Sequence, residues 1–243
     1  MNYQKVLEEI EKEIQPFLNE GKLANYIPAL ANVDDKKFAM SIQLFDGTSY
    51  HIGDSNLKFS IQSISKVFTF TLALNHYGKD LYKRVGHEPS GNPFNSLVQL
   101  EYENGIPRNP FINAGAIVTA DSLVSIYKKN TFDTILDFIK KTSNDETIVY
   151  DEEIFKSELA HGFRNFALIN MIKSFNNINN NIDDVIDTYF KQCSIMMNSS
   201  QLAKSMLFLA NHGVHPLTNE EIITESKAKR INSLMLTCGH YDA

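Results

Sequence analysis

The amino-acid sequence predicts an α+β fold, in which a small antiparallel sheet near the N-terminus packs on a large helical domain. Residues 37–44 and 48–52 alternate between apolar and polar side chains on either side of Asp46 and Gly47, a dipeptide typical of tight hairpin turns. After residue 114 apolar side chains recur every three or four positions, as they do on helices.

The length and composition are those of a soluble globular protein. We expect a single domain over residues 1–243, with a helix-and-hairpin part at 1–62 and a mainly helical part at 63–237. Hydrophobic residues make up 43% of the chain and charged residues 21%. The formal net charge of −6 argues against nucleic acid or an anionic membrane as the main partner.

The sequence shows no pattern of a membrane span, a signal peptide, a disulfide scaffold or a cysteine metal site. No apolar run is long enough to span a bilayer, and the acidic, amphipathic N-terminus is unlike a secretory signal peptide. Cys193 and Cys238 have no metal-ligand spacing and are too few for a disulfide scaffold. We therefore expect a cytoplasmic protein with free thiols.

The first elements follow from periodicity. Apolar residues fall on one face of a helix expected over residues 2–19. Residues 21–28 form a loop that carries the hydroxyl of Tyr26, and the hairpin follows. Residues 59–74 begin with alternating side chains and then become apolar and aromatic, which predicts a short approach to a buried helix that starts near Ser63.

One irregular stretch and a series of helices make up the rest. Residues 84–113 are rich in glycine, proline and asparagine, and a long irregular stretch in a compact domain is typical of a site wall. Residues 176–181 and 213–216 interrupt the helices, and Thr218 with Glu221 fits a capping box. Helices are expected near residues 115–129, 132–141, 152–158, 163–175, 182–192, 200–211 and 225–237.

Ser63 and Lys66 are three residues apart, so on a helix both side chains lie on the same face, one turn apart. A hydroxyl beside an amine is what a serine acyl-transfer enzyme needs. Lowering a lysine pKa by ~3 units from its usual ~10.4 takes ~4 kcal/mol, which burial in an apolar pocket supplies. The alternative is a lysine that extends its amine to solvent while Ser63 only caps the helix.

The spacing Ser-x-x-Lys occurs four times, and the surroundings distinguish the copies. Only Lys66 lies among apolar residues, which include Ile64, Val67 and Phe68. The other lysines lie in a polar turn or beside further charges, where a lysine stays protonated. Those pairs are Ser55/Lys58, Ser125/Lys128 and Ser226/Lys229.

Six blocks of sequence carry a family resemblance. They are Q-S-I-S-K-V-F, E-P-S-G-N-P-F-N-S, G-I-P-R-N-P-F-I-N-A-G-A-I, R-N-F-A-L, Y-F-K-Q-C-S-I and C-G-H-Y-D. In this order and spacing, over about residues 21–242, they resemble the serine-dependent glutaminases. The resemblance implies a β-lactamase/transpeptidase-like fold, a homo-oligomer (dimer or tetramer), and hydrolysis of L-glutamine to L-glutamate and ammonia without metal or organic cofactor.

The resemblance also assigns roles to residues. Ser63 corresponds to the nucleophile, Lys66 to its general base, and Tyr241 to the hydroxyl that relays a proton to the leaving ammonia. The amide of Ser63, at a helix start, is expected to donate one hydrogen bond to the oxyanion. The family's substrate-binding set maps onto Tyr26, Gln62, Asn113, Glu158, Asn165 and Tyr189.

These residue types fit glutamine, which is a zwitterion. Glu158 can accept from its α-ammonium, while the amides of Asn113 and Asn165 and tyrosine hydroxyls can donate to its α-carboxylate. Because a nearby carboxylate would raise the pKa of Lys66, Glu158 is expected to face the amino-acid end of the ligand. The structural alternatives are a helix cap for Asn113, solvated surface groups for Glu158 and Asn165, and packing roles for the tyrosines.

Charged residues outside this set are expected to be structural. Arg164 is a candidate for a structural ion pair. His87, His161 and His240 show no ligand spacing, so the sequence predicts no metal site.

The chain departs from the family at its end. It stops at Ala243, directly after the Tyr241 block, whereas family members continue with further strands, one of them a glycine-rich strand that supplies the second oxyanion donor. We therefore expect the C-terminal strands of the sheet to be missing. We favour a fragment of a longer enzyme over a truncated form with little activity.

Two other classes of function stay open. One is an inactive truncated chain that serves as a ligand-binding or subunit-interaction module. The other is a Ser-Lys acyl hydrolase related to penicillin-interacting enzymes, which would also show Ser-Asp-Asn and Lys-Thr-Gly. The nearest strings here begin at Ser143 and Lys141 and do not match.

Overall fold

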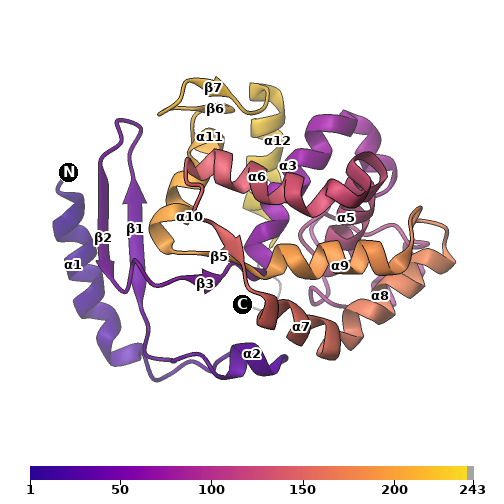
Figure 1. Ribbon diagram of the computed structural model, residues 1–243, viewed down its shortest axis with the longest axis horizontal. Coiled ribbons are helices and arrows are strands. Elements are labelled where there is room, and N and C mark those ends of the chain that lie inside the picture. The colour runs from indigo at the N-terminus through magenta and orange to yellow at the C-terminus, as the bar shows by residue number, and fades with distance from the viewer. Residues whose placement is uncertain (240–243) are drawn as a thin grey trace.

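The computed structural model describes residues 1–239, which form a helical body flanked by an N-terminal helix and a two-stranded hairpin (Figure 1). Besides the helices, these residues contain small antiparallel sheets of two or three strands. The predicted α+β class is confirmed. No helix among the described residues is both long and apolar enough to cross a lipid bilayer.

The N-terminal helix is shorter than the helix that its apolar pattern predicts. Helix α1 (Tyr3–Ile14) begins after Asn2, whose side chain accepts a hydrogen bond from an amide of the first turn. It then passes into a 3-10 turn, η1 (Gln15–Phe17), because Pro16 lacks the N–H that a continuing helix needs. The helix predicted over residues 2–19 is therefore right in its start and wrong in its end.

The predicted hairpin is confirmed. Strands β1 (Ala39–Gln43) and β2 (Ser49–Gly53) pair antiparallel around a turn in which Asp46 accepts a hydrogen bond from a backbone amide. Helix α1 packs on β2. The hydroxyl of Ser41 lies 2.8 Å from that of Ser199, and this contact ties the hairpin to the helical body.

The helices predicted from periodicity are present, with ends shifted by a few residues. The helix expected over residues 200–211 is divided in two. The helices around the centre of the body are α2 (Pro28–Ala31), α4 (Val98–Tyr102), α6 (Thr131–Ser143), α7 (Glu152–His161), α8 (Phe163–Ser174), α9 (Ile182–Cys193), α10 (Ser199–Ser205), α11 (Leu207–Ala210) and α12 (Glu225–Thr237).

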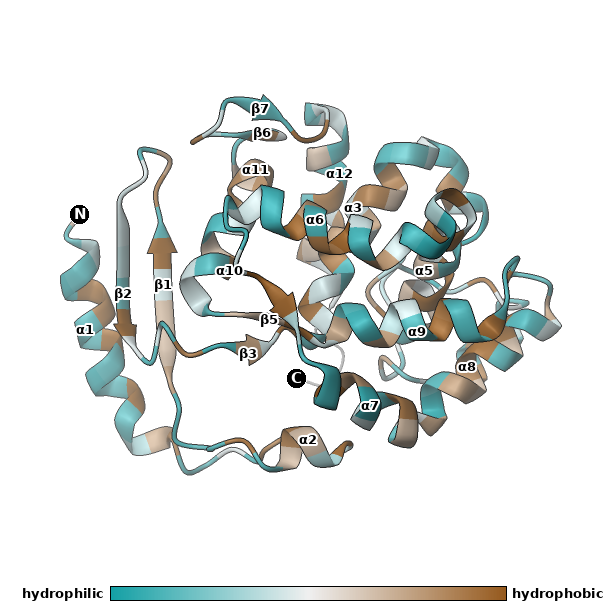
Figure 2. Ribbon diagram, viewed as in Figure 1, coloured by the Kyte–Doolittle hydropathy of each residue, from teal (hydrophilic) through white to brown (hydrophobic). Residues whose placement is uncertain are grey.

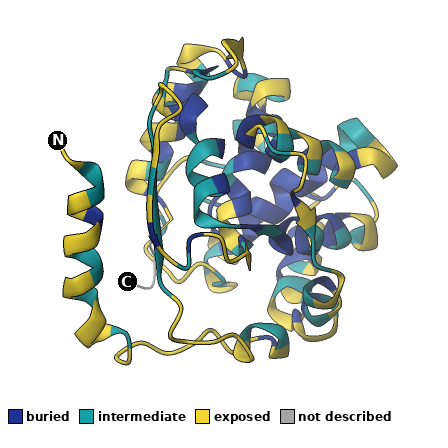
Figure 3. Ribbon diagram, turned by 60° about the vertical axis from the view of Figure 1, so that its left-hand side comes forward, coloured by how far each residue is buried: buried dark blue, intermediate teal, exposed yellow. Residues whose placement is uncertain are grey.

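Two buried helices form the centre of the body. Helices α3 (Ser65–Tyr77) and α5 (Asn113–Tyr127) pack against each other and contribute many of the core residues. Figure 2 shows α6 with a hydrophilic outer side and a hydrophobic inner side towards them. Figure 3 shows that buried residues gather in this body, whereas the N-terminal helix is largely exposed. The buried helix predicted to start near Ser63 is α3, entered through a 3-10 turn, η2 (Gln62–Ile64).

Two small sheets were not predicted. Strand β5 (Ile195–Met197) lies between β3 (Phe59–Ser60) and β4 (Val149–Tyr150) and pairs antiparallel with both. Strands of two or three residues leave too little alternation in a sequence to be recognised.

The capping box expected at Thr218 and Glu221 is wrong. Glu221 belongs to strand β7 (Glu220–Glu221), which forms a hairpin with β6 (Val214–His215). Asn219, at the turn, has a φ of +57°, a left-handed conformation that ends regular structure.

A buried carboxylate joins α5 to the asparagine-rich segment 176–181. Asp121 is fully buried and pairs with Arg84 at 2.5 Å. It also accepts hydrogen bonds from the backbone amides of Asn179 and Asn180. The segment predicted as a break between helices is therefore fixed to the core through one ionised group whose partners compensate for its burial.

Candidate active site

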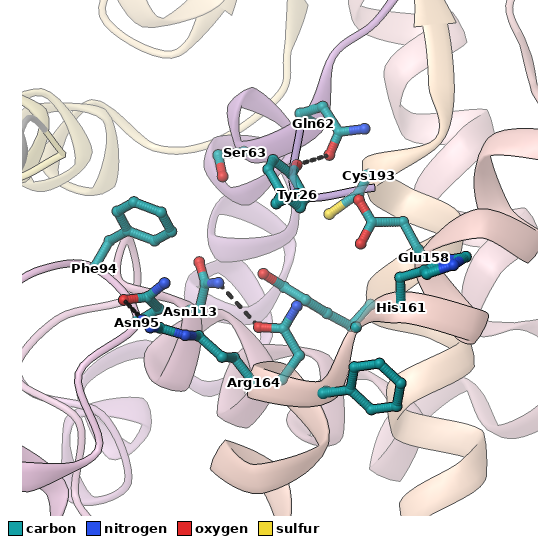
Figure 4. A pocket seen from close by; sticks show the side chains of 14 residues that line it. Tyr26, Gln62, Ser63, Phe94, Asn95, Asn113, Glu158, His161, Arg164 and Cys193 are labelled. Atoms are coloured by element: carbon teal, nitrogen blue, oxygen red, sulfur yellow. Dashed lines mark hydrogen bonds between the residues drawn. The ribbon is translucent and has the colours of Figure 1, made fainter. Parts of the chain in front are cut away.

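A cavity of about 420 Å³ opens at the start of the buried helix pair and is walled by α7, α8 and α9 (Figure 4). Its volume falls in the range of small-molecule sites, about 300–1,000 Å³. Seven of the residues predicted to form a site line it: Tyr26, Gln62, Ser63, Asn113, Glu158, Asn165 and Tyr189.

Ser63 lies on the η2 turn and is exposed at the cavity. Its amide belongs to the first turn of a helical segment, where N–H groups lack intrahelical acceptors. The alternative role as a helix cap is wrong, because no side chain of the described residues caps α3. The preceding residue, Gln62, has a φ of +45°, a conformation that few non-glycine residues adopt.

Lys66 is the second residue of α3, where it is buried, with 2% of its surface exposed. Its ammonium donates hydrogen bonds to Phe111 O (3.1 Å) and to Asn113 Oδ1 (2.7 Å). Burial lowers the Lys66 pKa to about 8. A lysine that reaches out to solvent, the alternative at this position, is therefore wrong.

The expected hydrogen bond between Lys66 and Ser63 is not present among the described residues. Among the described residues, the hydrogen bonds of the amine go to Phe111 and Asn113 and not to Ser63 Oγ. The dry environment expected of a lysine base is present, and its role as the base stays a prediction.

Asn113 connects the buried amine to the cavity. Its Oδ1 accepts a hydrogen bond from Lys66, and its Nδ2 donates to Asn165 Oδ1 at 2.9 Å. Figure 4 marks the bond from Asn113 to Asn165 with a dashed line that starts at the labelled Asn113. The alternative role of Asn113 as a helix cap is wrong, because α5 starts without a capping side chain. Asn165 is half-buried at the start of α8, and it lines the cavity rather than the outer surface.

Glu158 is a buried carboxyl group, 3% exposed, in the last turns of α7. Burial raises its pKa to about 7, against hydrogen bonding from Gln62 and Tyr26, which lowers it. The alternative of a solvated surface charge is therefore wrong. A carboxyl with this pKa is poised to ionise when a cationic group binds beside it.

The tyrosines differ in their exposure. Tyr26 is 57% exposed at the cavity, and its hydroxyl donates to Gln62 Oε1 at 3.1 Å. Tyr189 is 3% exposed, and burial raises the pKa of its phenol well above the ordinary value. Tyr241, the predicted proton relay, lies outside the described residues.

Sequence reasoning missed five residues of the cavity wall: His161, Gly162, Phe163, Arg164 and Cys193. Helical spacing from two predicted residues would have indicated two of them. His161 follows Glu158 by three positions and Cys193 follows Tyr189 by four, so each pair shares a helix face. Burial raises the Cys193 pKa to about 12, so its thiol is protonated at neutral pH.

The irregular stretch 84–113 does contribute to the wall, through Phe94 and Asn95. Arg164 donates to Asn95 Oδ1 at 3.0 Å and therefore joins this stretch to α8. The structural ion pair expected for Arg164 is wrong, because the described residues contain no salt bridge to it within 4 Å.

Comparisons with known proteins point to one family. The glutaminase family profile matches residues 21–243. The glutaminase of Aliarcobacter butzleri (strain RM4018) is 77% identical over 243 residues, which are 100% of this chain and 80% of that relative. The glutaminase of Rhizobium meliloti (strain 1021) is 49% identical over 240 residues, 98% of this chain and 76% of that relative.

Solved structures show the same fold. The crystal structure of a Bacillus subtilis probable glutaminase superposes with a TM-score of 0.90 at 33% identity, and the match covers 99% of this chain and 74% of that one. A Bacillus subtilis probable glutaminase complexed with 6-diazo-5-oxo-L-norleucine gives a TM-score of 0.88 at 32% identity, over 100% of this chain and 74% of that one. The predicted β-lactamase-like fold is therefore confirmed.

Proposed function

Because this chain belongs to the glutaminase family, we propose that it hydrolyses the side-chain amide of L-glutamine through an acyl-enzyme on Ser63. The observation that carries the proposal is the convergence of seven predicted site residues on one cavity, with a buried lysine of lowered pKa next to it. The Bacillus subtilis relative complexed with 6-diazo-5-oxo-L-norleucine supports a cavity for a glutamine-like amino acid.

Glutamine is held in the cavity by its two charged ends. Glu158 ionises and accepts from the α-ammonium, which compensates for the burial of both groups. The amides of Asn113 and Asn165 and the Tyr26 hydroxyl donate to the α-carboxylate. The carboxamide of the ligand then lies towards Ser63.

The first chemical step forms an ester between the substrate and Ser63. The neutral amine of Lys66 takes the Ser63 proton while Oγ attacks the amide carbon. With a pKa of about 8, roughly one lysine in ten is neutral at pH 7. The amide of Ser63 donates to the oxyanion, the C–N bond breaks, and ammonia leaves with a proton relayed by Tyr241.

In the second step, water attacks the glutamyl ester. Lys66 accepts a proton from this water, glutamate is released, and the Ser63 hydroxyl is restored. No step uses a metal or an organic cofactor. We also propose that residues 1–243 belong to one catalytic domain and that the protein acts in the cytoplasm. We further propose that it forms a homodimer or homotetramer, and analytical ultracentrifugation tests this oligomeric state.

Ammonia release from glutamine by the purified chain and by a Ser63→Ala variant tests the proposal. We expect the substitution to reduce kcat by more than about 10³-fold, because nucleophile and base act as a unit. Equal activity in both proteins would exclude Ser63 as the nucleophile. If neither protein releases ammonia while both bind glutamine, the chain acts as a binding module.

A further inference from the structure

The turn that presents Ser63 is held in an unfavourable backbone conformation. Gln62 has a φ of +45°, in the left-handed region, where Cβ crowds the backbone. Such a conformation persists only where the surroundings hold it. The contacts of Gln62 therefore decide how the next residue, Ser63, is oriented.

Ser65 holds the main chain of this turn. Its Oγ donates a hydrogen bond of 2.6 Å to Gln62 O, and its backbone N–H donates to the same oxygen. Ser65 is fully buried, so no solvent competes for this carbonyl from its side. The Gln62 side chain is held separately, by the Tyr26 hydroxyl and by Ser60 Oγ.

The carbonyl of Gln62 and the amide of Ser63 belong to one peptide unit. The unit is planar and trans, so its C=O and N–H point in opposite directions. Because Ser65 fixes the carbonyl towards the buried side, the Ser63 N–H is fixed in the opposite direction. The hydroxyl of Ser65 therefore controls the direction of the Ser63 N–H.

A second buried side chain orients Ser65. Gln192, at the end of α9, donates from Nε2 to Ser65 Oγ at 3.4 Å. When Ser65 Oγ accepts this bond, its own hydrogen is left to point at Gln62 O. Gln192 is fully buried, and its Oε1 has no hydrogen-bond partner among the described residues. An unpaired polar atom in a buried side chain calls for an explanation, and the hydrogen bond to Ser65 provides one.

We propose that Ser65 is a positioning residue for the reaction: it fixes the peptide unit between Gln62 and Ser63 so that the Ser63 amide faces the developing oxyanion, and Gln192 orients the Ser65 hydroxyl. The proposal rests on the proposed function, because an oxyanion forms only if Ser63 attacks an amide. Ser65 itself does not touch the substrate.

A Ser65→Ala variant tests this role. Oxyanion stabilisation acts in the transition state, so we expect kcat to fall at least about tenfold, within the 10²–10³-fold loss of a whole donor, with KM changed less than twofold. The pH at which kcat is half-maximal should not move, because the lysine base is untouched. A Ser65→Thr variant keeps the hydroxyl and should recover most of kcat.

Ser205→Ala is the matched control. Ser205 is also fully buried on a helix, and its Oγ donates at 2.8 Å to the carbonyl three residues earlier, Leu202 O. It lies outside the cavity, so kcat should stay at the wild-type value even if Tm falls. An unchanged kcat in Ser65→Ala, or equal losses of kcat in both variants, would overturn the proposal.

Two further variants, Gln192→Met and Ser63→Ala, distinguish misfolding of Ser65→Ala, failure of the proposed function and failure of the positioning role. If Ser65→Ala does not fold, Gln192→Met, which leaves Ser65 in place, should lower kcat about twofold to fivefold at unchanged KM, and an unchanged kcat would overturn the proposal. Full activity of Ser63→Ala would instead refute the proposed function. An inactive Ser63→Ala beside a fully active Ser65→Ala would refute only the positioning role.

Discussion

The buried amine of Lys66 should leave a signature in the stability of the protein as well as in its activity. A Lys66→Met substitution keeps the length of the side chain and removes the ionisable group. At pH 7 the ammonium is protonated in both the folded and the unfolded chain, and the folded state bears the cost of burying it. As the pH rises from about 8 towards 10.5, the folded chain loses this proton first, so the wild-type free energy of unfolding rises relative to the variant.

The magnitude follows from the pKa of about 8 in the folded protein and 10.5 in the unfolded chain. Each pH unit of this difference corresponds to about 1.36 kcal/mol, which makes the full cost roughly 3 kcal/mol at pH 7. At pH 10 most of that cost has been relieved. The difference between the free energies of unfolding of the two proteins should therefore change by roughly 2–3 kcal/mol between pH 7 and pH 10.

Urea denaturation of both proteins at several pH values measures this change. The variant also loses the hydrogen bonds of Lys66 to Phe111 and Asn113. This loss changes its free energy of unfolding by an amount that hardly depends on pH, so it cancels when the stability difference at two pH values is compared. The variant should also lack glutaminase activity at every pH. A stability difference that stays constant from pH 7 to pH 10 would refute a desolvated lysine with a lowered pKa.

Two other substitutions test the site and the core. Glu158→Gln should raise KM for glutamine about 10–100-fold, because a charge-assisted hydrogen bond is lost, and steady-state kinetics measures this. Because the Glu158 pKa is raised from 4.5 to about 7, ionisation of this group lowers the free energy of unfolding as the pH rises from 4.5 through 7. At pH 8 the Glu158→Gln variant should therefore be more stable than the wild type by roughly 3 kcal/mol. A variant less stable than the wild type at pH 8 would contradict the raised pKa. Asp121→Ala should lower the free energy of unfolding by about 3–5 kcal/mol, since it leaves Arg84 without its partner. Chemical denaturation checks this, and a loss below 1 kcal/mol would contradict it.

Strong periodic signals made much of the fold predictable. The hairpin follows from an Asp-Gly turn between alternating strands, and α12 has the bounds expected from its apolar spacing. The α1 end was missed because helical periodicity continues past Pro16, which stops the hydrogen bonding. Short strands such as β3 were missed because they form where distant segments meet, which no local pattern encodes.

The residues that line the cavity were largely predictable from the sequence, whereas their contacts were not. Family motifs indicated which residues converge on the cavity, but not that Lys66 would hydrogen bond to Asn113. The left-handed conformation of Gln62 has no local signal, since glutamine is not a residue that favours it. It depends on contacts with Tyr26 and Ser65, made across the folded chain and within the turn.

The position of Asn113 has a thermodynamic consequence. Its amide contacts both the wall where a ligand would sit and the amine behind that wall. A ligand that hydrogen bonds to the Asn113 amide changes the pKa of the Lys66 amine. By reciprocity, protonation of Lys66 changes the affinity for the ligand by the same factor. Ligand binding and the protonation of Lys66 are thus thermodynamically coupled. Calorimetric titrations in buffers of different ionisation enthalpy measure this coupling as the number of protons exchanged per ligand bound.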